Sequence, residues 1–257
     1  MDGRYDTLGP KIWNDVMYTQ SGNYQQTFTA ANGCDSIVTL HLVYHERVYD
    51  TRDGNTYLSM EYGNQVWTTE NMKYLPEVHK DRSSTDPKYY VYGYAPNGTP
   101  TVVAAHNRPN YTTYGVLYNY PAAAQTACPE GWHLPSQSEW ETLVTYLGSH
   151  GEYCGTNMAN VAKSMAANEL WSSSGVNCAV GNNMQDNNSS AFNGKPGGYL
   201  GSGNGNITTN SFAQITKEAN WWTSTSGQRA LIKYDSPSVV IESKALTWGF
   251  SVRCVKD

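Results

Sequence analysis

Near the middle of the chain stands the stretch Ala127-Cys-Pro-Glu-Gly-Trp-His-Leu-Pro-Ser-Gln-Ser-Glu-Trp140, which marks the start of the clearest helix. Ser136 and Glu139 have the spacing of a capping box, in which each side chain accepts a hydrogen bond from the other residue's backbone amide. Apolar residues then recur at positions i, i+3, i+4 and i+7, namely Trp140, Leu143, Val144 and Leu147. This spacing predicts a helix with one buried stripe, which ends at Gly148.

The segments around this helix predict strands and long loops. A hairpin is expected over residues 47–58 with its turn at Asp53-Gly54, and a second turn at Gly63-Asn64 leads to Val66-Trp67. A short helix is expected over residues 121–127, because proline favours the first helical position. Residues 80–110 and 168–210 show no periodicity and are expected to be mostly loop. Three strands are expected over residues 230–234, 239–244 and 248–255, and we expect Trp140 to pack against them, around Phe250 and Val252.

The five cysteines are Cys34, Cys128, Cys154, Cys178 and Cys254. None lies in a CxxC pair or at zinc spacing from a histidine, which disfavours a metal site. Cys154 and Cys178 flank one irregular segment, and a bridge from Cys128 to Cys254 would hold the last strand onto the helical region. We therefore predict these two disulfides, a free Cys34 and an oxidising, extracellular location. Five reduced, buried thiols in a cytosolic protein are the alternative.

The first 45 residues are expected to form a small β module that precedes a domain of residues 46–257. Two strands are expected within residues 24–43, joined at the hairpin signal Asn32-Gly33. The run of residues 29–42 resembles the end of a β-sandwich repeat common in large surface proteins of Bacteroidetes. A module this short can scarcely bury a core by itself. It is therefore either a fragment of such a repeat or packs on the following domain.

Five motifs carry a family resemblance, and they occur in the order Tyr114-Gly-Val-Leu-Tyr-Asn-Tyr120, residues 127–140, Pro196-Gly-Gly-Tyr199, Trp221-Trp-Thr-Ser-Thr225 and Gly249-Phe-Ser-Val-Arg-Cys254. Together they resemble the Fibrobacter succinogenes major paralogous domain from Val48 to Asp257. That family resembles the C-type lectin-like fold, an α+β fold with two short helices, long loops and twisted antiparallel sheets. Formylglycine-generating enzymes and the variable proteins of diversity-generating retroelements also use this fold. The resemblance implies cell-surface display and supports a Cys128–Cys254 bridge, which joins the first helix to the last strand in that fold.

The sequence shows no motif that indicates catalysis. Formylglycine-generating enzymes resemble the chain over residues 134–140, but they need a copper-binding cysteine pair near the C-terminus, where only Cys254 lies. The six histidines form no HxH or HExxH pattern, and we expect His133 to be a hydrogen-bonded structural residue. No GxSxG, P-loop or GxGxxG motif follows a strand. We therefore expect no enzymatic activity, no cofactor and no metal.

Calcium-dependent sugar binding is also disfavoured. Lectins of this fold hold calcium with a Glu-Pro-Asn or Gln-Pro-Asp loop and a Trp-Asn-Asp strand, since the ion needs six to eight oxygen ligands. The chain contains neither tripeptide loop, and its Trp13-Asn14-Asp15 lies in the N-terminal module. Glycan binding without calcium, through stacking on Tyr and Trp, stays open.

Composition excludes several classes of partner. The net charge of −5 and the absence of Lys/Arg-rich runs argue against nucleic acid. No apolar run is long enough to span a membrane, and residues 1–10 do not resemble a signal peptide, so we expect an exported protein whose leader is absent from this chain. The 20 Tyr and 8 Trp against 4 Phe are typical of binding surfaces. The alternative is that these rings fill the core of an irregular fold.

Ligand contacts are expected on the C-terminal strands, where substitutions gather in retroelement-diversified relatives. Successive side chains of a strand point to opposite faces of the sheet, which places Leu231, Lys233, Val239 and Ile241 together on one face. We expect the opposite face, with Ile232, Tyr234 and Val240, to pack inward. The alternative is that all of these are core residues. The candidate ligand-binding residues are Ser226, Gln228, Arg229, Leu231, Lys233, Val239, Ile241, Lys244 and Leu246.

Two functions follow from these observations. The first is an adhesin on the bacterial surface or a pilus tip, or a retroelement-diversified variable protein, that binds a protein or glycan on another cell or host surface. The second is a structural or assembly subunit that contacts other subunits of a surface appendage. An exposed face of mixed polarity on the C-terminal strands favours the first. An N-terminal module that lacks a strand favours the second.

Overall fold

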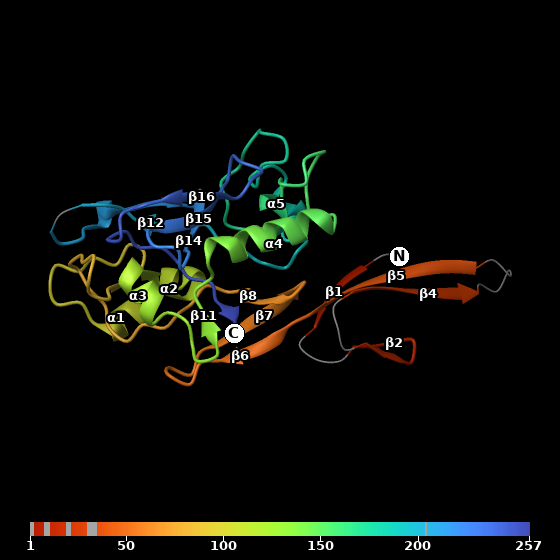
Figure 1. The fold of residues 1–257 in the computed structure, drawn as a ribbon, viewed down its shortest axis with the longest axis horizontal. Helices are drawn as coiled ribbons and strands as arrows, with labels where there is room; N and C mark the ends of the chain where they lie inside the picture. The colour runs from red at the N-terminus through yellow and green to blue at the C-terminus, as the bar shows by residue number, and fades with distance from the viewer. Residues whose placement is uncertain (1–2, 8–10, 19–21, 30–34, 204) are drawn as a thin grey trace.

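The computed structural model describes residues 3–7, 11–18, 22–29, 35–203 and 205–257. The fold is α+β, as predicted, with short helices beside small sheets that are antiparallel except for one strand pair (Figure 1). The helices are α1 (Val102–His106), α2 (Pro109–Tyr114), α3 (Tyr120–Gln125), α4 (Gln137–Ser149), α5 (Ala162–Met165), η1 (Met184–Asp186) and η2 (Thr209–Ser211). None of the helices in these residues is long and apolar enough to cross a membrane.

The N-terminal residues form two small sheets that project from the rest of the chain (Figure 1). One sheet has the order β1 (Gly3–Thr7), β5 (Asp35–Tyr44), β4 (Gly22–Thr29), with β1 parallel to β5. The other is the hairpin of β2 (Lys11–Trp13) and β3 (Val16–Tyr18), which contacts β4 through the ring pair of Tyr18 and Tyr24. The predicted pairing of two strands is confirmed, whereas the Asn32-Gly33 turn and Cys34 lie outside the described residues.

A five-stranded sheet begins directly after His45. Its order is β11 (Trp132–His133), β17 (Val255–Lys256), β8 (Gln65–Thr68), β7 (Thr56–Tyr62), β6 (Glu46–Tyr49). The hairpin turn around Gly54, which has a positive φ of 77°, and the turn at Gly63 are both confirmed. This sheet therefore brings the C-terminus beside the first strands after His45.

Helix α4 begins as predicted, with Ser136 and Glu139 forming the complete capping box. It ends at Ser149, one residue beyond the predicted end. Trp140 is fully buried. Its partners, however, are Trp67, Phe192 and Trp221 rather than the predicted Phe250 and Val252, which belong to a separate apolar cluster.

Two segments differ from the sequence prediction. Within residues 80–110, expected to be mostly loop, the chain forms α1 and begins α2. The expected strand over residues 248–255 is mostly irregular, because its backbone bridges three separate elements in turn. The bridged pairs are Leu200 with Gly249, Tyr118 with Phe250 and Trp221 with Ser251.

Both predicted disulfides are present. Cys128 is bonded to Cys254, which joins the segment before β11 to the segment before β17, and Cys154 is bonded to Cys178 across one irregular loop. The first bridge closes a separation of 126 residues and the second one of 24. The disulfides thus cross-link the chain near its C-terminal end and across residues 154–178, a segment that includes α5.

Candidate functional site

The candidate site lies on a three-stranded antiparallel sheet of order β14 (Glu218–Trp222), β15 (Gln228–Lys233), β16 (Val240–Ser243). Leu231 pairs with Val240, and Arg229 pairs with Glu242. Paired residues lie on the same face of a sheet, and alternate residues along a strand lie on opposite faces. The face that contains these pairs, called the outer face below, carries Glu218, Asn220, Trp222, Arg229, Leu231, Lys233, Val240 and Glu242.

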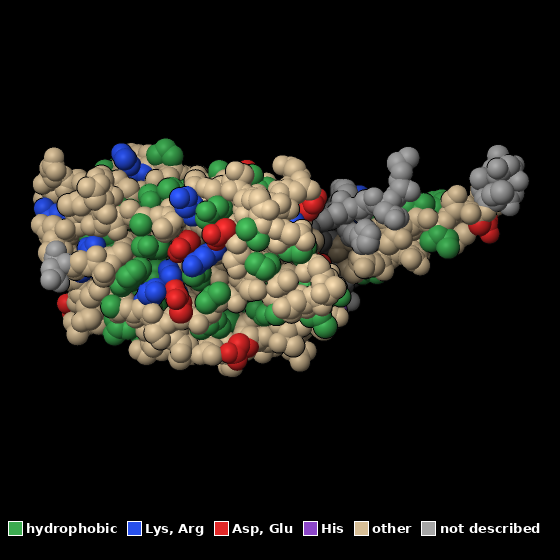
Figure 2. All heavy atoms as spheres, turned by 90° about the horizontal axis from the view of Figure 1, so that it is seen from above, with side chains coloured by type: hydrophobic (Ala, Val, Ile, Leu, Met, Phe, Trp, Pro, Cys, Tyr) green, Lys and Arg blue, Asp and Glu red, His purple; other side chains and the backbone are tan. Residues whose placement is uncertain are grey.

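The opposite face packs into the protein. Trp221, Ala230 and Ile232 are fully buried there, beside α4, and Val239 and Ile241 pack against the same cluster. The outer face, by contrast, is open at one end, where Lys233 is exposed and Val240 is 40% exposed. Figure 2 shows acidic and basic side chains gathered near the middle of this side of the molecule.

Arg229 lies at the centre of the outer face, with its side chain only 5% exposed. Its Nε donates to Oε1 of Glu242 at 3.1 Å, its Nη1 lies 3.5 Å from Oε2 of Glu218, and it also donates to Asn220. Lys244 reaches the same Glu242 carboxylate at 3.1 Å. The hydrogen bond from Arg229 holds the pKa of Glu242 below its ordinary value. The guanidinium therefore has two carboxylate partners and is held in one position.

Aromatic rings enclose this guanidinium on its other side. Its carbon lies 5.0 Å from the ring centre of Phe250, 5.6 Å from Tyr199 and 6.0 Å from Trp248. Tyr199 and Trp248 are in turn 5.1 Å apart and only partly buried. Such distances favour attraction between the cation and the ring faces. Aromatic rings and fixed charges thus occupy adjacent parts of one surface.

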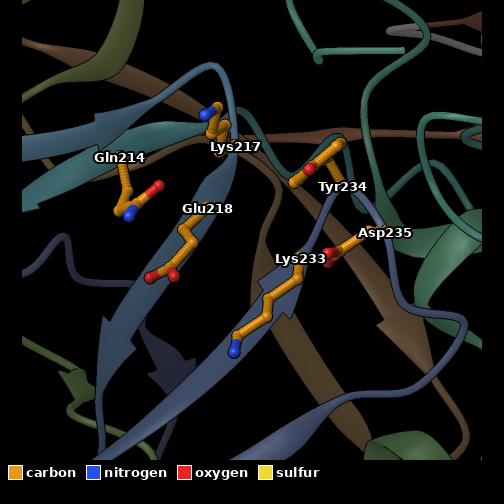
Figure 3. Close-up of a pocket in the computed structure, with 6 residues that line it drawn as sticks. All are labelled: Gln214, Lys217, Glu218, Lys233, Tyr234 and Asp235. Atoms are coloured by element: carbon orange, nitrogen blue, oxygen red, sulfur yellow. The ribbon is translucent and has the colours of Figure 1, made fainter. Parts of the chain in front are cut away.

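A pocket of about 250 Å³ opens at the exposed end of the outer face. Figure 3 shows Glu218 and Lys233 extending from neighbouring strands, with Gln214 across from Glu218. The full lining is Gln214, Lys217, Glu218, Lys233, Tyr234 and Asp235. Oε2 of Glu218 is buried, accepts no hydrogen bond from the described residues and has the Arg229 guanidinium as its ion-pair partner. Gln214, in strand β13 (Phe212–Ile215), and Thr216, in the turn that follows it, have positive φ values of 60° and 66°.

The nine predicted contact residues differ in how far the structure exposes them to solvent. Ser226 and Lys233 are exposed, and Gln228, Lys244 and Leu246 are partly exposed. Arg229 and Leu231 lie on the outer face as expected but are buried, at 4% and 1% exposure. A ligand at the surface would therefore meet Lys233 and Lys244 rather than these two side chains.

The predicted grouping of Val239 and Ile241 with Leu231 is wrong. Because Leu231 pairs with Val240, odd-numbered residues of β15 share a face with even-numbered residues of β16. Val239 and Ile241 consequently face the inner cluster, and Val240, expected inside, is exposed. The sequence prediction assumed a register in which odd-numbered residues of both strands share a face.

The sequence prediction also omitted residues that complete this surface. Glu242 could have been found as a cross-strand partner of Arg229 had the register been known, because opposite charges commonly pair there. Tyr199 lies in a quoted family motif, but only the tertiary structure places that motif beside Trp248. Gln214, Lys217 and Asp235 carry no sequence signal. Across the residues the structure describes, no three His, Cys, Asp or Glu side chains gather to hold a metal.

Comparison with known proteins identifies one family. Residues 60–256 match the family model described as the Fibrobacter succinogenes major domain. No curated protein and no solved structure matches the chain.

Proposed function

The chain belongs to the Fibrobacter succinogenes major domain family, and from this premise we propose that it is an extracellular, non-enzymatic binding module of C-type lectin-like fold. In this proposal it is displayed on the bacterial surface or a pilus tip, as an adhesin or a diversified variable protein. It contacts a protein or glycan through the exposed end of the outer face. The single observation that carries the proposal is the fixed Arg229 cluster, which lies between an open pocket and two partly exposed rings.

Preorganisation of the surface supports a binding role. Arg229 is held by Glu218 and Glu242, so neither carboxylate has to be ordered when a ligand arrives. A surface that is already ordered loses less conformational entropy on binding. Trp, Tyr and Arg are also the residue types that contribute most at binding surfaces. Tyr199 and Trp248, both partly exposed, lie close to Arg229 of the outer face.

Backbone geometry at the pocket is a second support. Gln214 and Thr216 are not glycines, yet both adopt positive φ, which non-glycine residues rarely do. Such conformations persist where the surrounding structure enforces them, and they gather at functional sites. The two disulfides fit an exported protein, since these bonds persist in oxidising compartments.

The experiment measures adhesion of beads coated with the purified chain, on a printed array of defined glycans and on fixed epithelial cells. The variant Lys233→Ala/Val240→Ser removes two exposed side chains of the outer face. We expect it to lose at least about 90% of bead retention with a stability change within about 0.5 kcal/mol. Periodate treatment of the cells should abolish binding of a glycan ligand, and trypsin treatment that of a protein ligand.

The matched control is Lys256→Ala/Val103→Ser, which makes the same two substitutions on other exposed surfaces. It should bind as the unmodified chain does. Equal adhesion by the two double variants would contradict the proposed face. Absence of binding to both the array and the cells would contradict an adhesin that recognises these surfaces.

An assembly subunit is a second candidate function, and the N-terminal module favours it. Strand β4 is eight residues long, and within the described residues no strand pairs with its outer edge. Ile12, Met17 and Ile37 of the same module are each more than 60% exposed. An unpaired edge can accept a strand from a neighbouring chain. If so, the chain should self-associate in sedimentation velocity, and Ile12→Ser/Met17→Ser/Ile37→Ser should make it monomeric while outer-face adhesion persists.

A further inference from the structure

Arg253 is a fully buried arginine whose surroundings differ from those of Arg229. It is 1% exposed and donates to four acceptors, all neutral. The acceptors are Oδ1 of Asn71 at 2.8 Å and the backbone carbonyls of Thr68, Phe192 and Asn193 at 3.0, 2.9 and 3.0 Å. In the described residues, no carboxylate lies within ion-pair distance of Arg253, whereas Arg229 has two.

Among the described residues no carboxylate forms an ion pair with Arg253, and Glu70 stabilises its positive charge only from beyond ion-pair distance. Burial lowers the pKa of Arg253 to about 9, so the guanidinium is still protonated at neutral pH. Carbonyl dipoles and the ring of Phe192, 4.6 Å from the guanidinium carbon, stabilise the cation but do not neutralise it. An unpaired buried charge costs several kcal/mol. One of its five N–H groups also remains without an acceptor in the described residues.

A small pocket lies beside this guanidinium, and its lining carries three cationic side chains and one acidic one among neutral residues. It measures about 100 Å³ and is lined by Thr69, Glu70, Asn71, Lys73, Thr112, Thr113, Tyr114, Asn193, Lys195 and Arg253. Lys73 forms no ion pair in the part of the chain described, and Lys195 has only a 3.6 Å contact with Glu169, a largely exposed carboxylate. Glu70, the one acidic lining residue, is not within ion-pair distance of Arg253 or of either lysine. Hydroxyls of Thr112 and Thr113 add further donors.

We propose that this pocket binds a small oxyanion, the carboxylate, sulfate or phosphate group of a ligand, through Arg253, Lys73 and Lys195. The anion supplies a direct ion-pair partner for Arg253, which Glu70 does not provide from its longer distance. Arginine donates to such groups with fixed geometry, and the flexible lysines close over it as point charges. The site shares no lining residue with the pocket on the outer face, so it stands independently of the adhesion proposal.

The test follows the side-chain Nε–Hε NMR signal of Arg253 in the full chain, with its disulfides intact. Inorganic sulfate, inorganic phosphate and sodium acetate are each titrated against chloride at constant ionic strength. We expect a saturable shift of this signal with at least one of the three anions. Preference for acetate indicates a carboxylate ligand, and preference for sulfate or phosphate indicates the corresponding ester.

Two variants make the result specific. Lys73→Gln/Lys195→Gln removes both lysines while leaving the buried Arg253 in place, and should weaken anion binding at least tenfold. Lys217→Gln/Lys233→Gln removes two lysines from the other pocket and the same net charge. It should change the dissociation constant by less than twofold. A linear, unsaturated shift, or equal weakening in both variants, would show general salt effects and overturn the proposal.

Discussion

Arg229 and Glu242 face each other across strands β15 and β16, and the Arg229 Nε donates to Glu242 Oε1 at 3.1 Å. Glu218 approaches the same guanidinium from β14. The arginine and Glu218 are largely shielded from water, at 5% and 13% side-chain exposure, whereas Glu242 is 38% exposed. This triad joins all three strands of the sheet that carries the candidate site.

Replacing this arginine should destabilise the fold. Arg229→Met leaves the partly buried Glu218 without its cation, and loss of one partner of a buried ion pair costs about 3–5 kcal/mol. The free energy of unfolding from urea titration measures the effect. Lys233→Met, at the exposed end of the same strand, is the control and should change it by less than about 0.5 kcal/mol. Equal effects of the two substitutions would contradict the buried position of Arg229.

Trp140 should contribute strongly to stability through packing alone. Trp140→Ala removes a fully buried ring that contacts Trp67, Phe192 and Trp221, with an expected cost of about 3–5 kcal/mol. The indole N–H of Trp140 finds no hydrogen-bond partner among the described residues. Trp140→Phe should therefore cost clearly less, because it keeps an aromatic ring and removes an unsatisfied donor. Guanidinium titration of both variants decides this, and similar losses would argue against packing as the cause.

The two disulfides should differ in their effect on stability. A bridge restricts the unfolded chain more when it closes a longer loop, by about 5 kcal/mol for a separation of 126 residues and about 3.5 kcal/mol for 24 in the chain-entropy model. Cys128→Ser/Cys254→Ser should thus lower the unfolding free energy more than Cys154→Ser/Cys178→Ser. Urea titrations of the two double variants make the comparison. The reverse order would show that local native contacts, rather than loop closure, dominate.

His133 should make stability depend on pH. Its ring nitrogens lie 2.7 Å from Glu139 and 2.7 Å from Asp257, which links the start of α4 to the C-terminus. Burial opposes protonation, but hydrogen bonds to the two carboxylates outweigh it and raise the pKa of His133. The stabilisation is therefore complete below the unfolded pKa of about 6.5 and is lost as the pH rises through the higher folded pKa.

The size of this effect is limited by solvent, since the His133 side chain is 41% exposed. We expect less than about 1 kcal/mol. Urea midpoints at pH 6 and pH 8.5 are compared for the unmodified chain and for His133→Gln. The difference between the two proteins should be larger at pH 6, and this comparison cancels the other titrating groups, including His79. A difference independent of pH would contradict the ion-pair role.

Local sequence predicted those features that depend on nearby residues. The capping box of Ser136 and Glu139, the turns around Gly54 and Gly63 and the stripe that buries Trp140 all involve residues within a few positions of one another. The conformational preferences of these features depend on neighbouring residues and not on contacts with distant parts of the chain. The Cys128–Cys254 pairing is a long-range contact, and the family resemblance supported it where local pattern alone left alternatives open.

The arrangement of the candidate site depends on strand register, which local sequence does not specify. Alternation along β15 and β16 was predictable, but the pairing of Leu231 with Val240 was not, because it is set by how the connecting segment packs. A shift of one residue exchanges the two faces of a strand. The sequence by itself therefore determined the capped helix α4 and the strands β15 and β16, within a residue or two of their observed bounds. The tertiary structure alone decided that Val240 faces solvent and that Arg229 lies buried between two carboxylates, since register and burial arise only when distant elements pack.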